Sequence, residues 1–199
     1  MLSEKQINLI NDKLTIFEPC VIFARKFLVL PSIKIEFNDC PSNMFHTMDN
    51  AAESNLAYDG TGCIYFNAPW FAERVIEHQD DVEFFLFHEL RHLHQMIQVN
   101  LMAANKKTRE PVEIVKVWKD GFDNYQRNDG GESQFSNVTQ EIEIDANAYG
   151  IILTMLYRNG KHPLLSLPEE AMNPADERLQ RYIDTLPEFR SFSYRTIHD

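Results

Sequence analysis

The sequence contains few cysteines. Only Cys20, Cys40 and Cys63 are present among 199 residues, and no two of them form a C-x-x-C pair. Closely spaced cysteines are the usual ligands of zinc knuckles and the usual reactive pair of disulfide oxidoreductases, so the sequence favours neither kind of site. An odd number of irregularly spaced thiols is typical of reduced side chains, and we therefore expect a cytoplasmic protein.

Positive charge is also scarce, and no long apolar run is present. The chain has 19 Lys and Arg against 30 Asp and Glu, which gives a formal net charge of -11. Surfaces that bind nucleic acid are basic, so we predict no nucleic-acid partner. Residues 14–30 are apolar but are interrupted by Glu18, Pro19, Arg25 and Lys26, which argues against a membrane span. The N-terminal residues lack the basic-then-apolar layout of a signal peptide.

The chain shows neither an internal repeat nor a linker between domains. A length of 199 residues is enough for one sizeable hydrophobic core. We therefore predict a single domain over residues 1–199, of the α+β class, with a small sheet beside a mostly helical body. Alternating or short apolar runs bounded by turn residues predict strands at residues 33–37, 62–66 and either 45–48 or 56–58. Residues 50–55 have a composition typical of a turn.

Helices are predicted where apolar residues recur at helical spacing and where capping residues or proline begin a segment. They cover residues 4–17, 19–28, 68–78, 80–104, 111–119, 138–158 and 174–185. Residues 120–137 are rich in Gly, Asp, Asn, Ser and Gln. This composition predicts a flexible loop, which would be either the wall or lid of a cleft or a surface insertion without a role.

The most informative segment is His88-Glu89-Leu90-Arg91-His92, which matches the pattern H-E-x-x-H. In an α-helix residues i and i+4 lie on one face about one turn apart, so His88 and His92 can reach a single metal ion. Glu89 lies on an adjacent face, where it can hold and deprotonate a water bound to the metal. The pattern therefore predicts a zinc site in which Glu89 is the catalytic general base.

The residues around this motif are apolar on most sides of the predicted helix. The apolar residues are Phe84, Phe85, Leu86, Phe87, Leu90, Leu93, Met96, Ile97 and Leu101. Such a helix is buried, and buried histidines need a partner. The alternative, an exposed helix that happens to carry polar histidines, is disfavoured by these neighbours.

A catalytic zinc ion usually has three protein ligands, so a third ligand must come from elsewhere. The predicted helix 138–158 offers Glu143 and Glu141 in competing registers. Each has a polar residue four positions on, Asn147 or Asp145, that could orient a ligand histidine. The glutamate that is not a ligand would lie on a solvated face. His94 is a poorer alternative, because it lies two residues past the second motif histidine and points to a different side of the helix.

Two segments together resemble the ImmA/IrrE-type zinc metallopeptidases, and in particular their small relatives in bacteria, phages and mobile elements. Those proteins pair H-E-L-x-H with a later E-x-[DE]-A-N-x-[FY], which residues 87–95 and 143–149 match. Residues 64–70 also fit a strand followed by tryptophan that is common in the family. The resemblance covers roughly residues 30–155. This chain departs from the family in having Arg91 where many relatives have glycine, and in a long stretch between the motifs.

The resemblance assigns the third zinc ligand to Glu143, because the first glutamate of the second motif has this role in the family. It implies a zincin-like fold of the minimal gluzincin type and a zinc-dependent peptidase that hydrolyses a peptide bond in a protein substrate. Relatives that cleave often cut a repressor or another regulator, so a regulator protein is one expected substrate. The alternative is a catalytically silent zinc-binding regulatory or phage accessory protein on the same scaffold.

Further residues receive expected roles around this site. The tetrahedral intermediate needs a donor besides the metal, and the candidates are Tyr149, Tyr125, His94 and His162, with Tyr149 expected in the core instead. We expect Arg91 to form a structural ion pair with Asp145 or Glu141. The strand at residues 63–66 is the candidate for pairing with an extended substrate, although an ordinary interior strand is an equal alternative.

Overall fold

The computed structural model describes residues 2–38, 51–125, 139–161, 163, 165, 167–186 and 189. These residues form α1 (Glu4–Lys13), the 3-10 turn η1 (Leu14–Ile16), α2 (Phe17–Ala24), β1 (Ile33–Asn38), β2 (Ala52–Leu56), β3 (Gly62–Asn67), α3 (Ala68–Glu77), α4 (Gln79–Ala103), α5 (Val112–Asp123), α6 (Glu141–Tyr157) and α7 (Glu169–Thr185). The predicted α+β class, a small sheet with a mostly helical body, is confirmed. Among these elements no helix has the length and apolar character needed to cross a membrane.

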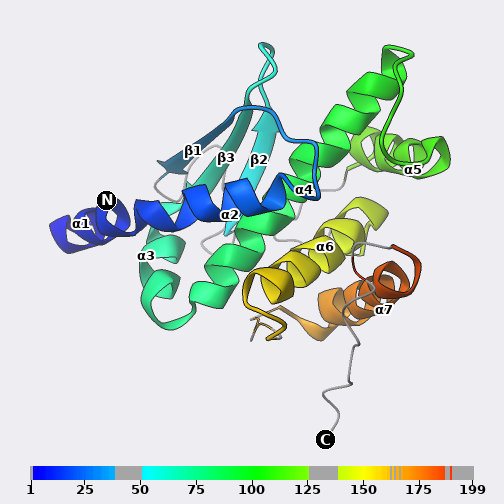
Figure 1. Cartoon of the computed structure of the whole chain (residues 1–199). Coiled ribbons are helices and arrows are strands. Elements are labelled where there is room, and N and C mark those ends of the chain that lie inside the picture. Colours follow the sequence, from blue (N-terminus) through cyan, green and yellow to red (C-terminus); the bar gives the residue numbers. More distant parts are fainter. Residues whose placement is uncertain are drawn as a thin grey trace, which may run out of the picture.

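Helix α4 lies at the centre of the fold. In Figure 1 it runs diagonally through the molecule, with the sheet on one side and α6 and α7 on the other. It packs against β2, α2, α3, α5 and α6. Asp80 and Asp81 occupy its first turn, where the helix dipole favours acidic side chains. Phe84, Phe87 and Leu90 are fully buried, as expected for a helix that is apolar on most sides.

The sheet has three strands in the order β1-β3-β2. β1 is parallel to β3, and β2 is antiparallel to it, so β3 is the central strand. Ile64 and Phe66 on β3 are fully buried. The strands predicted at residues 33–37 and 62–66 are confirmed. Of the two alternatives for residues 63–66, the ordinary interior strand is confirmed and the strand that pairs with a substrate is not, because β3 is paired with β1 on one side and with β2 on the other.

The strand β2 differs from the sequence prediction. Residues 50–55 have the polar composition of a turn, yet Ala52 to Asn55 lie in β2 and pair with β3. Their polar side chains are tolerated because β2 is an edge strand that remains partly exposed. Of the two alternatives for the third strand, residues 56–58 contribute only the last residue of β2, and residues 45–48 lie outside the described part of the chain.

Helix α6 packs closely along α4. Ile142, Ala146 and Leu153 of α6 are fully buried, as the helical spacing predicts. Gly150 permits the close approach, since a Cβ atom built there would lie 2.9 Å from Cε2 of Phe84 and 3.3 Å from its backbone oxygen. The two helices that carry the predicted metal-binding residues are therefore held side by side.

Two helices extend beyond their predicted bounds. Residues 120–123, predicted as part of a flexible loop, belong to α5, and residues 126–137 lie outside the described part of the chain. Gly121 is used for packing, because a Cβ atom there would lie 2.6 Å from Cγ2 of Ile142. Helix α7 begins at Glu169, with Pro168 as its N-cap, and Pro174 lies in its interior. Ala171 and Ala175, on either side of this proline, are fully buried, so the helix continues through it while packed on the rest of the fold.

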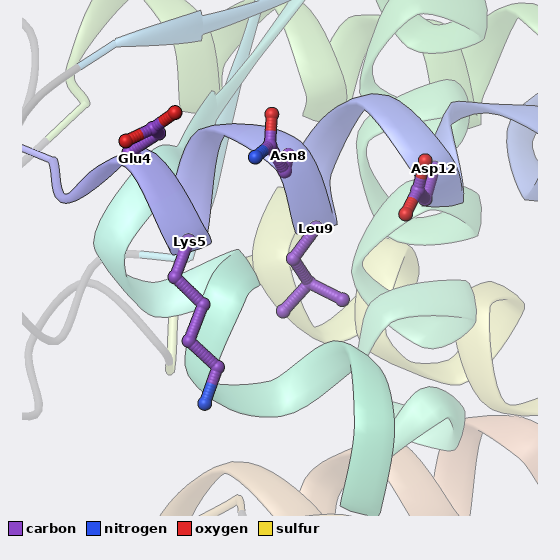
Figure 2. Close-up of a pocket in the computed structure, with 5 residues that line it drawn as sticks. All are labelled: Glu4, Lys5, Asn8, Leu9 and Asp12. Carbon is purple, nitrogen blue, oxygen red and sulfur yellow. The ribbon is translucent and has the colours of Figure 1, made fainter.

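Helix α1 lies at the rim of the fold against α3. Ile10 is buried, but Ile7 is 46% exposed, so only part of the predicted apolar face is covered. α2 ends at Ala24, earlier than predicted. A hollow open to solvent runs along α1 and is lined by Glu4, Lys5, Asn8, Leu9 and Asp12 (Figure 2). None of the predicted metal-binding residues lines this hollow.

Candidate metal centre

Two histidines of α4 and one glutamate of α6 meet where these helices pack together. The Nε2 atoms of His88 and His92 lie 3.0 Å apart. Oε2 of Glu143 lies 3.4 Å from Nε2 of His88, and Oε1 of Glu143 lies 3.5 Å from Nε2 of His92. All three residues are buried. Within the described ranges, this is the group of histidine, cysteine and acidic side chains whose atoms are close enough to hold a metal ion together.

The dimensions of this triangle fit a metal ion. Ligand atoms around a tetrahedral ion with bond lengths of about 2.0–2.1 Å lie about 3.3 Å apart. The two imidazole nitrogens lie 3.0 Å apart, and one carboxylate oxygen of Glu143 lies 3.4 Å from His88 and the other 3.5 Å from His92, close to that value. Taking one ligand atom from each residue, all three lie within 4.8 Å of one another. Two imidazoles and one carboxylate are also a donor set that suits a divalent transition metal and leaves a fourth position for water.

The buried charges in the cluster depend on one another. Burial disfavours the ionised form of Glu143, but His92 and His88 outweigh this effect and hold its pKa well below the usual range. Burial likewise disfavours protonated His92, yet Glu143 raises the pKa of His92 to about 9. The carboxylate therefore strongly attracts a positive charge at this position, and a metal cation would compete with the proton for it.

Glu141 and His94, the alternative third ligands, both lie elsewhere. Glu141 is largely exposed, and its Oε2 accepts a hydrogen bond from Arg178 at 2.6 Å. His94 is fully buried, with Nδ1 accepting a hydrogen bond from the backbone N–H of Val29 at 2.9 Å. Its Nε2 lies 3.3 Å from Oε1 of Glu110, so both ring nitrogens have partners away from the cluster. Glu143 is the residue that the structure brings to the histidines.

Glu89 lies beside the cluster, as the motif predicts. Its Oε1 is 4.0 Å from Nε2 of His88, and its side chain is 7% exposed. The carboxylate is therefore close to the predicted metal position without belonging to the triangle of ligand atoms. This is the placement that a general base acting on a metal-bound water requires.

Arg91 forms the buried ion pair predicted with Asp145. Its Nε and Nη2 donate to the two carboxylate oxygens at 2.8 and 3.3 Å, and its Nη1 donates to Glu110 at 3.1 Å. The guanidinium also lies 4.8 Å from the ring centre of Trp118 and 3.9 Å from that of Tyr149. Arg91 thus joins α4 to α6 beneath the histidines. The alternative pairing with Glu141 does not occur.

Tyr125 is the predicted donor that reaches the cluster. Its hydroxyl donates to Oε1 of Glu143 at 2.8 Å, while 39% of the residue remains exposed. Burial and the negative charge of Glu143 raise its pKa, so the hydroxyl stays protonated at neutral pH. Tyr149 is buried in the core, as expected. His162 lies outside the described residues.

Aromatic side chains flank the histidines on both sides. The ring of Phe85 lies 6.2 Å from that of His88 and 5.2 Å from that of Trp70. On the α5 side, the ring of Phe122 lies 6.4 Å from that of His92. These rings restrict the rotation of the imidazoles and lower the local polarity, which strengthens electrostatic interactions in the cluster.

Sequence reasoning gave no role to Gln95 or to Phe122. Gln95 lies three residues after His92 on the same helix, a spacing at which side chains contact, and its Oε1 is 2.8 Å from Nδ1 of His92. That spacing was a usable signal. No comparable signal identifies Phe122, because its contact with His92 depends on how α5 packs against α4.

Comparison of the chain with protein-family models, with curated proteins and with solved structures found no match in any of the three.

Proposed function

We propose that the protein is a zinc-dependent peptidase in which His88, His92 and Glu143 hold the metal and Glu89 is the general base. The observation that carries the proposal is the triangle of buried ligand atoms with Glu89 beside it. Zinc is the proposed metal because two neutral imidazoles and a carboxylate are the protein ligands of known catalytic zinc sites, and because a structural site would not need a base in this position.

A zincin-like fold of the minimal gluzincin type is part of the same proposal. Three features support it: the two histidines lie on one central helix, the glutamate comes from a second helix packed against it, and a sheet covers another side of the central helix. The motifs in residues 87–95 and 143–149 that resemble the ImmA/IrrE-type metallopeptidases also support it.

The bound zinc ion would lower the pKa of a coordinated water to about 7 and so supply a nucleophile at neutral pH. The carboxylate of Glu89, beside the histidines, would accept a proton from the attacking water and would return it to the leaving amine. Tyr125 offers its hydroxyl as a hydrogen-bond donor to the oxyanion, since it is protonated, partly exposed and already at the cluster.

The substrate proposed is an extended segment of a protein or peptide, such as an exposed segment of a regulator protein. β2 is a better candidate than β3 for pairing with it, because β2 is at one end of the strand order, with β3 on one side, whereas β3 has a described strand on both sides. β2 also packs against α4, the helix that carries the histidines. An extended peptide added to this edge would lie near the metal and gain backbone hydrogen bonds irrespective of its sequence.

The test of the proposed activity is Glu89→Gln, which keeps the size of the side chain but removes the base. The variant should retain the wild-type zinc content and thermal stability and lose at least about 100-fold in hydrolysis of a library of quenched fluorescent peptides. Asp123→Asn, a change at an exposed acid of α5, is the matched control and should hydrolyse like the wild type.

The silent zinc-binding protein is the competing function. A zinc-loaded wild type that cleaves no peptide of the library and no denatured protein would favour it over the peptidase.

A further inference from the structure

The side-chain amide of Gln95 has a fixed orientation. Gln95 is fully buried, and its Nε2 donates to the backbone oxygen of Ile142 at 3.1 Å and to Oδ2 of Asp145 at 2.6 Å. Both partners are oxygens that accept hydrogen bonds, the second in a carboxylate paired with an arginine. Rotating the amide by half a turn would place the carbonyl oxygen of Gln95 against these two acceptors, which is unfavourable in a buried site.

This orientation determines the tautomer of His92. With its amide nitrogen facing α6, Gln95 presents its carbonyl Oε1 to Nδ1 of His92 at 2.8 Å. A carbonyl oxygen only accepts hydrogen bonds, so the hydrogen must be on Nδ1. In a neutral ring the lone pair is then on Nε2, the atom that faces His88 and Glu143. The donor atom of His92 is thereby directed into the triangle of ligand atoms.

We propose that Gln95 is a positioning residue, which holds the ring of His92 and selects its Nε2 as the metal ligand. The inference deepens the proposed function, since it rests on the proposed metal centre, but it does not depend on peptidase activity. The hydrogen-bond chain begins on Arg91, passes through Asp145 to Gln95 and ends on His92. The hydroxyl of Tyr182 also donates to Asp145, which links α7 to this chain.

The two histidines are held differently. Nδ1 of His88 is buried and has no hydrogen-bond partner among the residues that the structure describes, whereas Nδ1 of His92 is bound by Gln95. Removing a hydrogen-bonding partner of a metal-ligating histidine typically lowers the metal affinity by about 10- to 100-fold. We therefore expect Gln95 to orient the ring of His92 and to leave the ring of His88 unaffected.

The test combines metal affinity with a direct measurement of the ring. Gln95→Met keeps the length of the side chain and removes both its donor and its acceptor. Zinc affinity, measured by competition with a chromophoric chelator, should fall by about 10- to 100-fold. Gln98→Met is the matched control, because Gln98 is fully buried on the same helix and binds the backbone N–H of Arg109 instead of a cluster histidine. Its affinity should remain within about twofold of the wild type.

Nitrogen-15 NMR of the histidine rings tests the inference without any variant. In the zinc-loaded wild type, and in the metal-free protein at alkaline pH, where the ring is neutral, Nδ1 of His92 should carry the hydrogen. A hydrogen on Nε2, an unchanged zinc affinity in Gln95→Met, or an equal loss in Gln98→Met would each overturn the proposal. A wild type that binds no zinc would instead overturn the metal centre, and the alkaline NMR measurement would still decide the contact between Gln95 and His92.

Discussion

At the scale of single residues, the direction in which each side chain leaves its helix decides its role. Glu141 and Glu143 are two positions apart on α6, which turns their side chains by about 200° relative to each other. Glu143 consequently faces the histidines, and Glu141 faces Arg178 near the surface. The same rule separates His94 from His92 on α4. Helical periodicity predicts that two side chains two positions apart point in different directions, but it does not predict which of the two faces the interior of the protein.

Tyr125 provides a prediction at this scale. Tyr125→Phe removes the hydroxyl and leaves the ring and all three metal ligands, so the variant should still bind one zinc ion at saturating metal, with a weaker affinity because Glu143 loses a hydrogen bond. The loss of one donor to the oxyanion should reduce kcat for peptide hydrolysis by about 100-fold, with little change in KM. Steady-state kinetics on a peptide cleaved by the wild type measures both. Tyr58→Phe, at a fully exposed tyrosine, is the control. An unchanged kcat in Tyr125→Phe would show that this hydroxyl only binds Glu143.

At the scale of helices and strands, the buried pair of Arg91 and Asp145 joins α4 to α6. Both side chains are almost fully buried, and the charge of each is balanced by the opposite charge of the other. Such a pair contributes little net stability compared with apolar residues, yet removing one partner leaves a buried charge without compensation. We therefore infer that the pair helps to specify how the two helices that carry His88, His92 and Glu143 pack against each other.

Arg91→Met should consequently reduce the free energy of unfolding by about 3–5 kcal/mol. Asp145→Asn should also be destabilising, and the double variant should be less destabilised than the sum of the two single changes, because neither Arg91 nor Asp145 then remains as a buried charge without the other, although Glu110 still loses its contact with Arg91. Urea denaturation of the metal-free proteins measures these values. Arg25→Met, at an exposed arginine that donates hydrogen bonds to the backbone oxygens of Leu30 and Pro31 and pairs with no acid among the described residues, is the control. Strict additivity in the double variant would show that the two side chains do not interact.

Glu110, which lies just before α5, gives the second prediction at this scale. Burial alone would raise its pKa, but the hydrogen bond from His94 and the charge of Arg91 outweigh burial and lower its pKa from 4.5 to about 2. The ionised form is therefore favoured in the folded protein. This contribution to stability is complete above pH 4.5 and is lost as the pH falls from 4.5 toward 2.

The contribution amounts to on the order of 3 kcal/mol. Urea denaturation of the metal-free wild type and of Glu110→Gln, at pH values above and below this window, measures it. The variant should be less stable than the wild type above the window, and the difference between the two proteins should shrink as the pH falls. Parallel pH profiles for the two proteins would contradict the assignment.

At the scale of the whole molecule, the parts that the sequence predicts well are those determined locally. Helix α4 can be predicted from its acidic first turn and its continuous apolar surface. The placement of His88 and His92 on one face follows from the geometry of any α-helix. The class of the fold and the strands β1 and β3 follow from periodicity in the same way. The choice of Glu143 required the resemblance between two motifs, because helical periodicity alone left Glu141 equally acceptable.

The parts that the sequence predicts poorly depend on tertiary contacts. The polar residues of β2 resemble a turn until β3 is available to pair with them. Gly121 and Pro174 are residues that usually end helices, but here Gly121 makes room for Ile142, and Pro174 is held within a helix packed on α6. The role of Gln95 requires the carbonyl of Ile142 and the carboxylate of Asp145, which only the packing of α6 on α4 brings within reach.

The most direct test of the metal centre is zinc content per chain, measured by elemental analysis after reconstitution and desalting. The wild type should bind close to one zinc ion per chain. Glu143→Gln and His88→Ala should be depleted, and Glu141→Gln, the matched change two positions away, should bind like the wild type. Zinc retained in Glu143→Gln but lost in Glu141→Gln would move the third ligand, and a wild type that binds no zinc at all would contradict the account.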